Sequence, residues 1–184
     1  MASASRRRIP PRDIAFLIGR RSARVVGLDI TARMIALARR KAESRKTGAV
    51  PAFLVGDMMA LPFPAASFDL VTTGYGLRNV PNLTTAIDEI ARVLKPGGQV
   101  LSLDFDRPSN PLVRSVYLLY LTAVGGALGW LLHHDPDTYR YIPASIRNYP
   151  GAKAVARLME ARGFSCVRHV RVLGGLMAIH DARK

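Results

Sequence analysis

The chain has 184 residues, and 49% of them are hydrophobic, so it is long and apolar enough to form one domain with a sizeable core. Its formal net charge of +14 favours anionic partners such as acidic lipid headgroups, but the arginines are scattered and no DNA- or RNA-reading motif is present, so we expect no nucleic-acid binding. Cys166 is the only cysteine, which excludes a disulfide or a cysteine-based zinc cluster within the chain.

The first part of the chain alternates between helical and strand patterns. Asp13–Arg21 has the apolar spacing of a helix, and residues 23–29 (ARVVGLD) are a β-branched run typical of a buried parallel strand. Thr31 is the expected N-cap of a helix over residues 32–46. Residues 51–57 (PAFLVGD) then predict a second strand.

The same alternation continues along the chain. Residues 68–74 (FDLVTTG) predict a third strand, residues 82–95 an amphipathic helix, and residues 99–105 (QVLSLDF) a fourth strand. Near the C-terminus, a helix over residues 151–164 precedes two strands joined at Gly174-Gly175, which is typical of a hairpin turn. The pattern predicts an α/β fold, with a parallel sheet that ends in an antiparallel hairpin.

A strongly apolar segment, residues 111–134, interrupts this pattern. Ser115 to Leu132 is a run of 18 residues without a charge, which is at the lower limit for a membrane span. A spanning helix would have to leave the domain and return, because more α/β-type sequence follows. We therefore expect a helix that is half-buried or touches a membrane, with a true span as the alternative.

Two acidic residues stand at the carboxyl ends of successive predicted parallel strands. Ligands of such sheets bind outside these ends. Asp29 could accept hydrogen bonds from ribose hydroxyls, and Asp57 could accept one from the exocyclic amine of an adenine. Taken singly, Asp29 could equally cap the next helix and Asp57 could start a turn. Their joint placement favours a nucleotide-type ligand.

Four segments together resemble one enzyme family: "GLDIT", "VGDMMALPFPAASFDLVTTGYGLRNV", "EIARVLKPGG" and "YRYIPASI" are similar to motifs of the quinone-biosynthesis C-methyltransferases. The resemblance runs from about Asp13 to the C-terminus. It implies a Rossmann-like class I methyltransferase sheet, S-adenosylmethionine (SAM) as cofactor and a polyprenyl quinol as substrate. The implied reaction is C-methylation of demethylmenaquinol, of the benzoquinol precursor of ubiquinol, or of both.

The resemblance also implies a set of cofactor-binding residues. Asp29 would hold the ribose hydroxyls, and Ile30 would pack on the adenine. Asp57 and Met58 would border the adenine ring, and Gly74 would lie near the methionine moiety. Similar enzymes often have serine in place of Gly74.

Arg78 and Asn79, in "GLRNV", correspond to the family's catalytic candidates. A ring carbon of a hydroquinone becomes nucleophilic when a ring hydroxyl loses its proton. Because arginine stays protonated, we expect Arg78 to stabilise the phenolate electrostatically and Asn79 to orient Arg78. The alternative is that Arg78 pairs structurally with an acid such as Asp57 or Asp69.

Two aromatic residues are candidates for the substrate pocket. Tyr139 and Tyr141, in "YRYIP", could line the pocket for the quinol ring, and plain packing is an equally good interpretation. No metal site is expected, because the adjacent residues His133 and His134 point apart on a helix.

The N-terminal segment departs from the family pattern. Similar enzymes have a strand and an acidic-x-Gly-x-Gly turn where this chain has Ile9, Pro10, Pro11 and Arg12, so we expect the first strand and the Gly-rich loop to be missing. The expected organisation is an atypical basic segment, residues 1–12, and a truncated methyltransferase domain, residues 13–184, with an apolar insertion at about 112–148. Three explanations stay open: a late start of the sequence, a paralogue that no longer binds cofactor, or completion by another chain or copy.

The resemblance and the charge together predict partners and a location. We expect a cytoplasmic protein with peripheral contact at the inner face of a membrane, and we keep a homo-oligomer as an open expectation. The competing interpretation is a catalytically impaired pseudo-methyltransferase that acts as a binding partner in quinone biosynthesis.

Overall fold

The computed structural model describes residues 24–43, 51–134, 139 and 141–184. The chain forms two compact units, residues 1–62 and 63–184. The expected helix at Asp13–Arg21, the basic segment 1–12 and the replaced Gly-rich loop lie outside the described residues. The expected division at residue 12 therefore stays a prediction.

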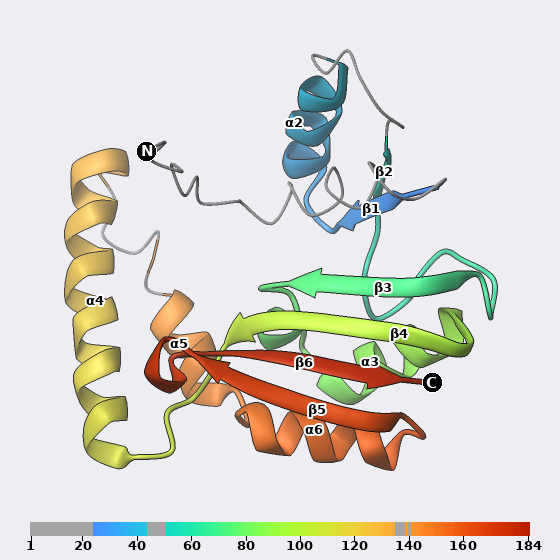
Figure 1. Ribbon diagram of the computed structural model, residues 1–184. Helices are drawn as coiled ribbons and strands as arrows, with labels where there is room; N and C mark the ends of the chain where they lie inside the picture. Colours follow the sequence, from blue (N-terminus) through green and yellow to red (C-terminus); the bar gives the residue numbers. More distant parts are fainter. Residues whose placement is uncertain (1–23, 44–50, 135–138, 140) are drawn as a thin grey trace, which may run out of the picture. The chain divides into compact units, whose positions relative to one another are not determined.

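The first unit contains a two-stranded parallel sheet. Strand β1 (Val26–Asp29) pairs with β2 (Ala52–Val55), and Asp29 lies opposite Val55 in the register. Helix α2 (Ala32–Glu43) connects them and buries one small apolar face, as the alternating pattern predicts (Figure 1). The parallel pairing brings the carboxyl ends of β1 and β2 to the same edge of this sheet.

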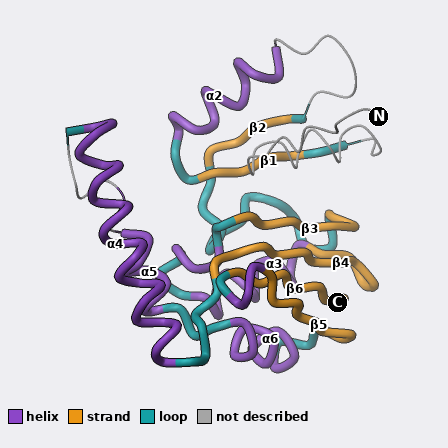
Figure 2. The backbone as a smooth tube through the Cα atoms, turned by 60° about the vertical axis from the view of Figure 1, so that its left-hand side comes forward, coloured by secondary structure: helices purple, strands orange, loops and turns teal. Residues whose placement is uncertain are grey.

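The second unit contains a four-stranded mixed sheet in the order β3-β4-β6-β5. Strand β3 (Phe68–Gly74) is parallel to β4 (Leu94–Phe105), and β6 (Met177–Arg183) pairs antiparallel with both β4 and β5 (Ser165–Val172) (Figure 2). This arrangement confirms the predicted parallel strands followed by an antiparallel hairpin. Among the described strands, β1 pairs only with β2, and β3 pairs only with β4.

Helices α3 (Leu83–Val93) and α6 (Ala152–Ala161) contribute most of the core of the second unit. The side chain of Asn82 accepts a hydrogen bond of 3.1 Å from the backbone N–H of Thr85 and so caps α3. The helix ends two residues earlier than predicted, because Pro96 disfavours a helical conformation at the residue before it. The fully buried apolar side chains of this core include Ile87, Ile90, Val100, Val155 and Met159.

The apolar segment forms a single long helix, α4 (Pro111–His133), followed by the short helix α5 (Tyr141–Asn148). The side chain of Asn110 caps α4 by accepting hydrogen bonds from two backbone N–H groups of its first turn. One face of α4 packs against α5, with Tyr117, Leu118 and Ile146 in a shared cluster. By length and composition alone, α4 is also long and apolar enough to cross a membrane.

We expect His180 on β6 to make the stability of this unit depend on pH. Its ring is buried, and its Nε2–H donates a 2.9 Å hydrogen bond to the carbonyl of Ala152. Burial lowers the pKa of His180, so the unfolded chain binds more protons than the folded protein just below pH 6.5. The free energy of unfolding should therefore fall on acidification below about pH 6.5, with a slope of at most about 1.4 kcal/mol per pH unit from this group.

This pH dependence can be measured by urea unfolding at pH 7.5, 6.5 and 5.5. The variant His180→Gln keeps a hydrogen-bond donor but cannot titrate, so it should lose part of the slope. An unchanged slope in His180→Gln would contradict the assignment to this residue.

Candidate functional site

At the edge of the first unit, Asp29 ends β1 with part of its carboxylate free. One oxygen, Oδ1, accepts a 2.8 Å hydrogen bond from the backbone N–H of Thr31, the residue before helix α2. The other oxygen has no partner among the described residues. Ile30 follows with 68% of its surface exposed. An acceptor next to an exposed apolar side chain is suited to a ribose and an aromatic base.

Asp57 repeats this arrangement after β2. Its Oδ1 accepts a 2.8 Å hydrogen bond from the N–H of Met59, which makes a turn, and its second oxygen has no described partner. Met58 is half-buried next to it. The N–H of Gly56 donates to the carbonyl of Asp29 at 3.1 Å, so the ends of the two strands are directly joined. The structure thus places these four residues along one edge and leaves an acceptor on each aspartate.

In the second unit, β3 ends in a tight turn at Gly74-Tyr75-Gly76. Tyr75 has a φ of 58°, which is rare for a residue with a side chain, and its N–H donates to the carbonyl of Leu103 at 2.8 Å. The side chain of Asn79 donates to the carbonyl of Tyr75 at 2.9 Å. Backbone in such a conformation is found at functional sites when the surroundings hold it. Gly74 therefore leads into a turn that is fixed by β4 and Asn79.

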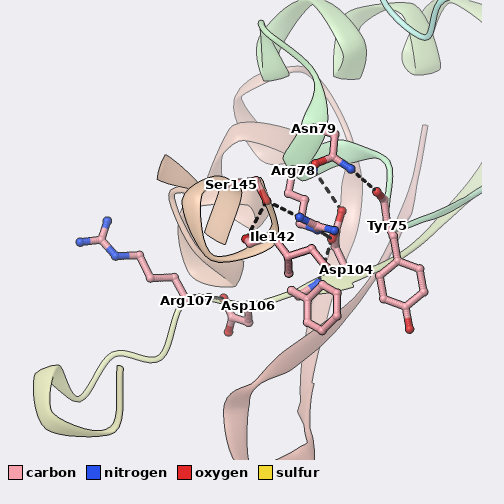
Figure 3. Close-up of polar contacts among 9 residues, drawn as sticks. Tyr75, Arg78, Asn79, Asp104, Asp106, Arg107, Ile142 and Ser145 are labelled. Atoms are coloured by element: carbon pink, nitrogen blue, oxygen red, sulfur yellow. Dashed lines mark hydrogen bonds and ion pairs between the residues drawn. The ribbon is translucent and has the colours of Figure 1, made fainter. Parts of the chain in front are cut away.

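Arg78 follows this turn in a short 3-10 helix, η1 (Leu77–Asn79), and its side chain is buried (Figure 3). Its Nε lies 3.0 Å from Oδ1 of Asp104, and its backbone N–H donates to Oδ2 of the same carboxylate at 3.1 Å. Its Nη1 donates to the hydroxyl of Ser145 on α5. Arg78 is thus held by two elements, and the acid that pairs with it is neither Asp57 nor Asp69.

Aromatic rings surround the guanidinium group. The Cζ atom of Arg78 lies 5.0 Å from the centre of the Phe105 ring and 5.8 Å from that of Tyr141. The rings of Tyr75 and Phe105 are 5.2 Å apart. A cation over aromatic faces is a stable arrangement, and the same surfaces can stack on a planar ring.

Asp104 is the functional candidate that our sequence analysis missed. It stands next to the last residue of β4 and is 1% exposed. Burial raises its pKa, while Arg78 and the backbone N–H of Phe105 act in the opposite direction. Asp29 and Asp57 were identified as acids at the carboxyl ends of predicted parallel strands. The same rule applies to "LSLDFD" and could have identified Asp104.

Asp106, two residues further on, has a structural role. Its Oδ1 accepts hydrogen bonds from the backbone N–H groups of Arg107 and Ala152, at 2.8 and 2.7 Å. Its Oδ2 lies 3.2 Å from Nε of Arg171. A carboxylate at the start of α6 also interacts favourably with the helix dipole. Asp106 therefore joins β4, α6 and β5.

The two tyrosines of "YRYIP" differ in their surroundings. Tyr141 is 55% exposed and lies beside Arg78. Tyr139 is half-buried against α4, where a Cβ atom added to Gly125 would lie 3.3 Å from the Cβ of Tyr139. The contacts therefore bring Tyr141 to the arginine and place Tyr139 against α4. In the described part of the chain, no group of three His, Cys, Asp or Glu residues could hold a metal ion.

Comparison with known proteins identifies the family. Residues 12–184 match the ubiE/COQ5 methyltransferase family. The chain belongs to this family. It is 41% identical over 170 residues to a demethylmenaquinone methyltransferase of Thermus thermophilus, covering 91% of this chain and 76% of that protein. It is 37% identical over 174 residues to a ubiquinone/menaquinone biosynthesis C-methyltransferase of Dinoroseobacter shibae, covering 94% and 70%.

Solved structures support the same fold. A SAM-dependent methyltransferase from Methanosarcina mazei superimposes with a TM-score of 0.63 at 21% identity, covering 92% of this chain and 85% of that one. The predicted family, the class I methyltransferase fold, the enzyme class and SAM as cofactor are thus confirmed. The comparisons do not favour the non-catalytic alternative.

Proposed function

We propose that this ubiE/COQ5 family member transfers a methyl group to a ring carbon of a polyprenylated hydroquinone. The substrate would be demethylmenaquinol, the benzoquinol precursor of ubiquinol, or both. The observation that carries the proposal is the buried Arg78, which is fixed by Asp104 and Ser145 and bordered by the rings of Phe105 and Tyr141. The names of the relatives from Thermus thermophilus and Dinoroseobacter shibae support the choice of a quinol.

The first task of the site is to favour ionisation of a ring hydroxyl. A phenol has a pKa of about 10, so its phenolate is scarce at neutral pH without assistance. Nη2 of Arg78 has no partner among the described residues, and in this proposal it donates a hydrogen bond to the phenolate oxygen. Asp104, whose Oδ1 lies 3.0 Å from Nε, pairs with the guanidinium as its counter-charge and fixes the direction of that donor.

Asp104 lies next to Arg78, and burial raises its pKa, so in this proposal its carboxylate accepts the released proton. Asn79 acts through the backbone in our proposal. Its side chain bonds to the carbonyl of Tyr75 and so holds the turn next to Gly74, where the substrate ring would meet the methyl donor. Tyr141 offers a planar surface beside Arg78, and Tyr139 supports α4.

We propose that residues of the first unit hold the adenosine part of the cofactor. In the proposal, the free oxygen of Asp29 accepts from a ribose hydroxyl and Ile30 packs on the adenine. Asp57 accepts from the exocyclic amine, and Met58 borders the ring. S-adenosylmethionine supplies an electrophilic methyl group when bound. In the proposal, the methionine part of the cofactor lies near Gly74 at the end of β3.

The proposed substrate also bears on location. A polyprenyl tail dissolves in a bilayer, so we propose a cytoplasmic enzyme that makes peripheral contact with the inner face of a membrane. A homo-oligomer stays part of the proposal as an expectation from the sequence.

The proposal is tested by incubating the full chain with methyl-labelled SAM and reduced quinols that carry a short tail. We expect a product heavier by one methyl group, with the label on a ring carbon by mass spectrometry. Cofactor binding without any methylated quinol would favour the non-catalytic alternative.

Asp29→Asn should weaken the binding of SAM. A hydrogen bond to a charged group contributes about 1.5–3 kcal/mol, so the dissociation constant should rise by about tenfold or more. Isothermal titration calorimetry measures this constant directly. Asp69→Asn is the matched control, since Asp69 is an exposed partner of Lys95 and should leave SAM binding unchanged. Equal affinities of the two variants would contradict the role of Asp29.

A further inference from the structure

Helix α4 is apolar on two opposite faces. Its inner face contains Tyr117 and Leu118, each 8% exposed, which pack with Ile146 of α5. Its outer face is formed by residues that follow one another at intervals of three or four, which places them on one side of a helix. These residues are Leu112, Val116, Leu119, Ala123, Ala127 and Trp130, and all are exposed.

The outer face is unusual for a surface helix. Leu119 is 71% exposed and Trp130 is 64% exposed, whereas such a face normally carries charged or polar groups. The only charged residue of α4 is Arg114, which lies toward the inner side and is half-buried. A large exposed apolar surface of this kind marks a site that binds another protein or a membrane.

The charges around α4 indicate which kind of partner its outer face binds. Residues 107–134 contain no acidic residue, and the chain as a whole carries a net charge of +14. Arg107 precedes the helix, and Arg147 is exposed on the adjoining α5; neither forms an ion pair with a described residue. Figure 3 shows the side chain of Arg107 extending away from the Arg78 cluster. At the outer face of α4, this charge disfavours a second copy as the partner and favours anionic lipid.

We propose that the outer face of α4 docks the protein onto an anionic lipid surface. The helix lies in the interfacial plane, with Leu119 and Trp130 inserted among the acyl chains and with Arg107 and Arg147 at headgroup level. Packing of the inner face on Ile146 keeps α4 on the folded unit, which argues against a span. The inference rests on the proposed function for its purpose, because a docked enzyme meets a lipid-dissolved tail.

The test is flotation of the full chain with vesicles, without substrate or cofactor. We expect binding to vesicles of phosphatidylcholine with anionic phosphatidylglycerol, weaker binding at high salt, and release by an alkaline carbonate wash. Leu119→Ser combined with Trp130→Ser should lower the vesicle partition coefficient by about tenfold or more. Val170→Ser, at a residue 59% exposed on β5, is the control and should bind like the unmodified chain.

Several results would overturn the docking proposal. These are no binding of the unmodified chain, equal binding of the double variant, or resistance to the carbonate wash, which indicates a span. A dimer in light scattering that the double variant abolishes would identify a second copy as the occupant. Circular dichroism establishes that the variants are folded. Methylation of a short-tail quinol is measured in parallel, so failure of docking and failure of the proposed reaction are separate results.

Discussion

Asp104→Asn should lower the free energy of unfolding by about 3–5 kcal/mol, which is a large part of the stability of a small protein. The substitution keeps the shape of the side chain but leaves the guanidinium of Arg78 buried without its counter-charge. The side chains of Arg78 and Asp104 are only 3% and 2% exposed, so water offers little compensation. Urea unfolding at pH 7.5, followed by circular dichroism, measures the change.

Two further variants test whether the loss of stability in Asp104→Asn comes from the unpaired charge of Arg78. Asp69→Asn removes the acid of an exposed pair, whose Nζ–Oδ1 distance to Lys95 is 2.8 Å, and should cost at most about 1 kcal/mol. The double variant Arg78→Met with Asp104→Leu removes both charges and should recover most of the stability, because well-packed apolar replacements of buried pairs are often neutral. A similar loss in Asp104→Asn and Asp69→Asn would show that Arg78 is not dependent on its partner.

The order of the elements could be predicted from the sequence, because each has a strong local signal. Strand β1 (Val26–Asp29) lies in the short run of residues 23–29 that contains two adjacent valines, and Leu83–Val93 repeats apolar residues at helical spacing behind an Asn cap. The hairpin was marked by Gly174-Gly175, and Gly174 does adopt a positive φ of 67°. Local patterns of this kind do not depend on the rest of the chain.

The contacts of the candidate site could not be predicted in the same way. Arg78 and Asp104 are 26 residues apart in the sequence, and Ser145 is 67 residues from Arg78. No periodicity links such residues, since they meet only through the register of β3 and β4 and the packing of α5. Asp69 and Asp57 were equally reasonable partners before that register was known. Arg78 was identified from the resemblance to a family, whereas its acidic partner, Asp104, was identified only from the fold.

The double variant Arg78→Met with Asp104→Leu also carries the strongest prediction on activity. If it folds as expected, its kcat for methylation of a short-tail quinol should fall by about 100- to 1000-fold, as is typical when a preorganised group that stabilises an oxyanion is removed. The value of KM for SAM should change little, because the residues proposed to hold the adenosine are in the other unit. Steady-state kinetics on the folded variant measures both.

The dependence of kcat on pH separates a catalytic arginine from a structural one. When Arg78 stabilises the phenolate, ionisation of the bound quinol is complete at a lower pH than in free solution. Without Arg78, the hydroxyl should ionise nearer to the ordinary pKa of a phenol, about 10, so kcat of the variant should keep rising up to that pH. Arg78→Lys keeps the charge but loses the planar fork of the guanidinium. Its pH profile of kcat should lie between the profiles of the unmodified chain and of the double variant. A lower kcat with an unshifted profile would instead assign Arg78 to the packing of α5 against η1.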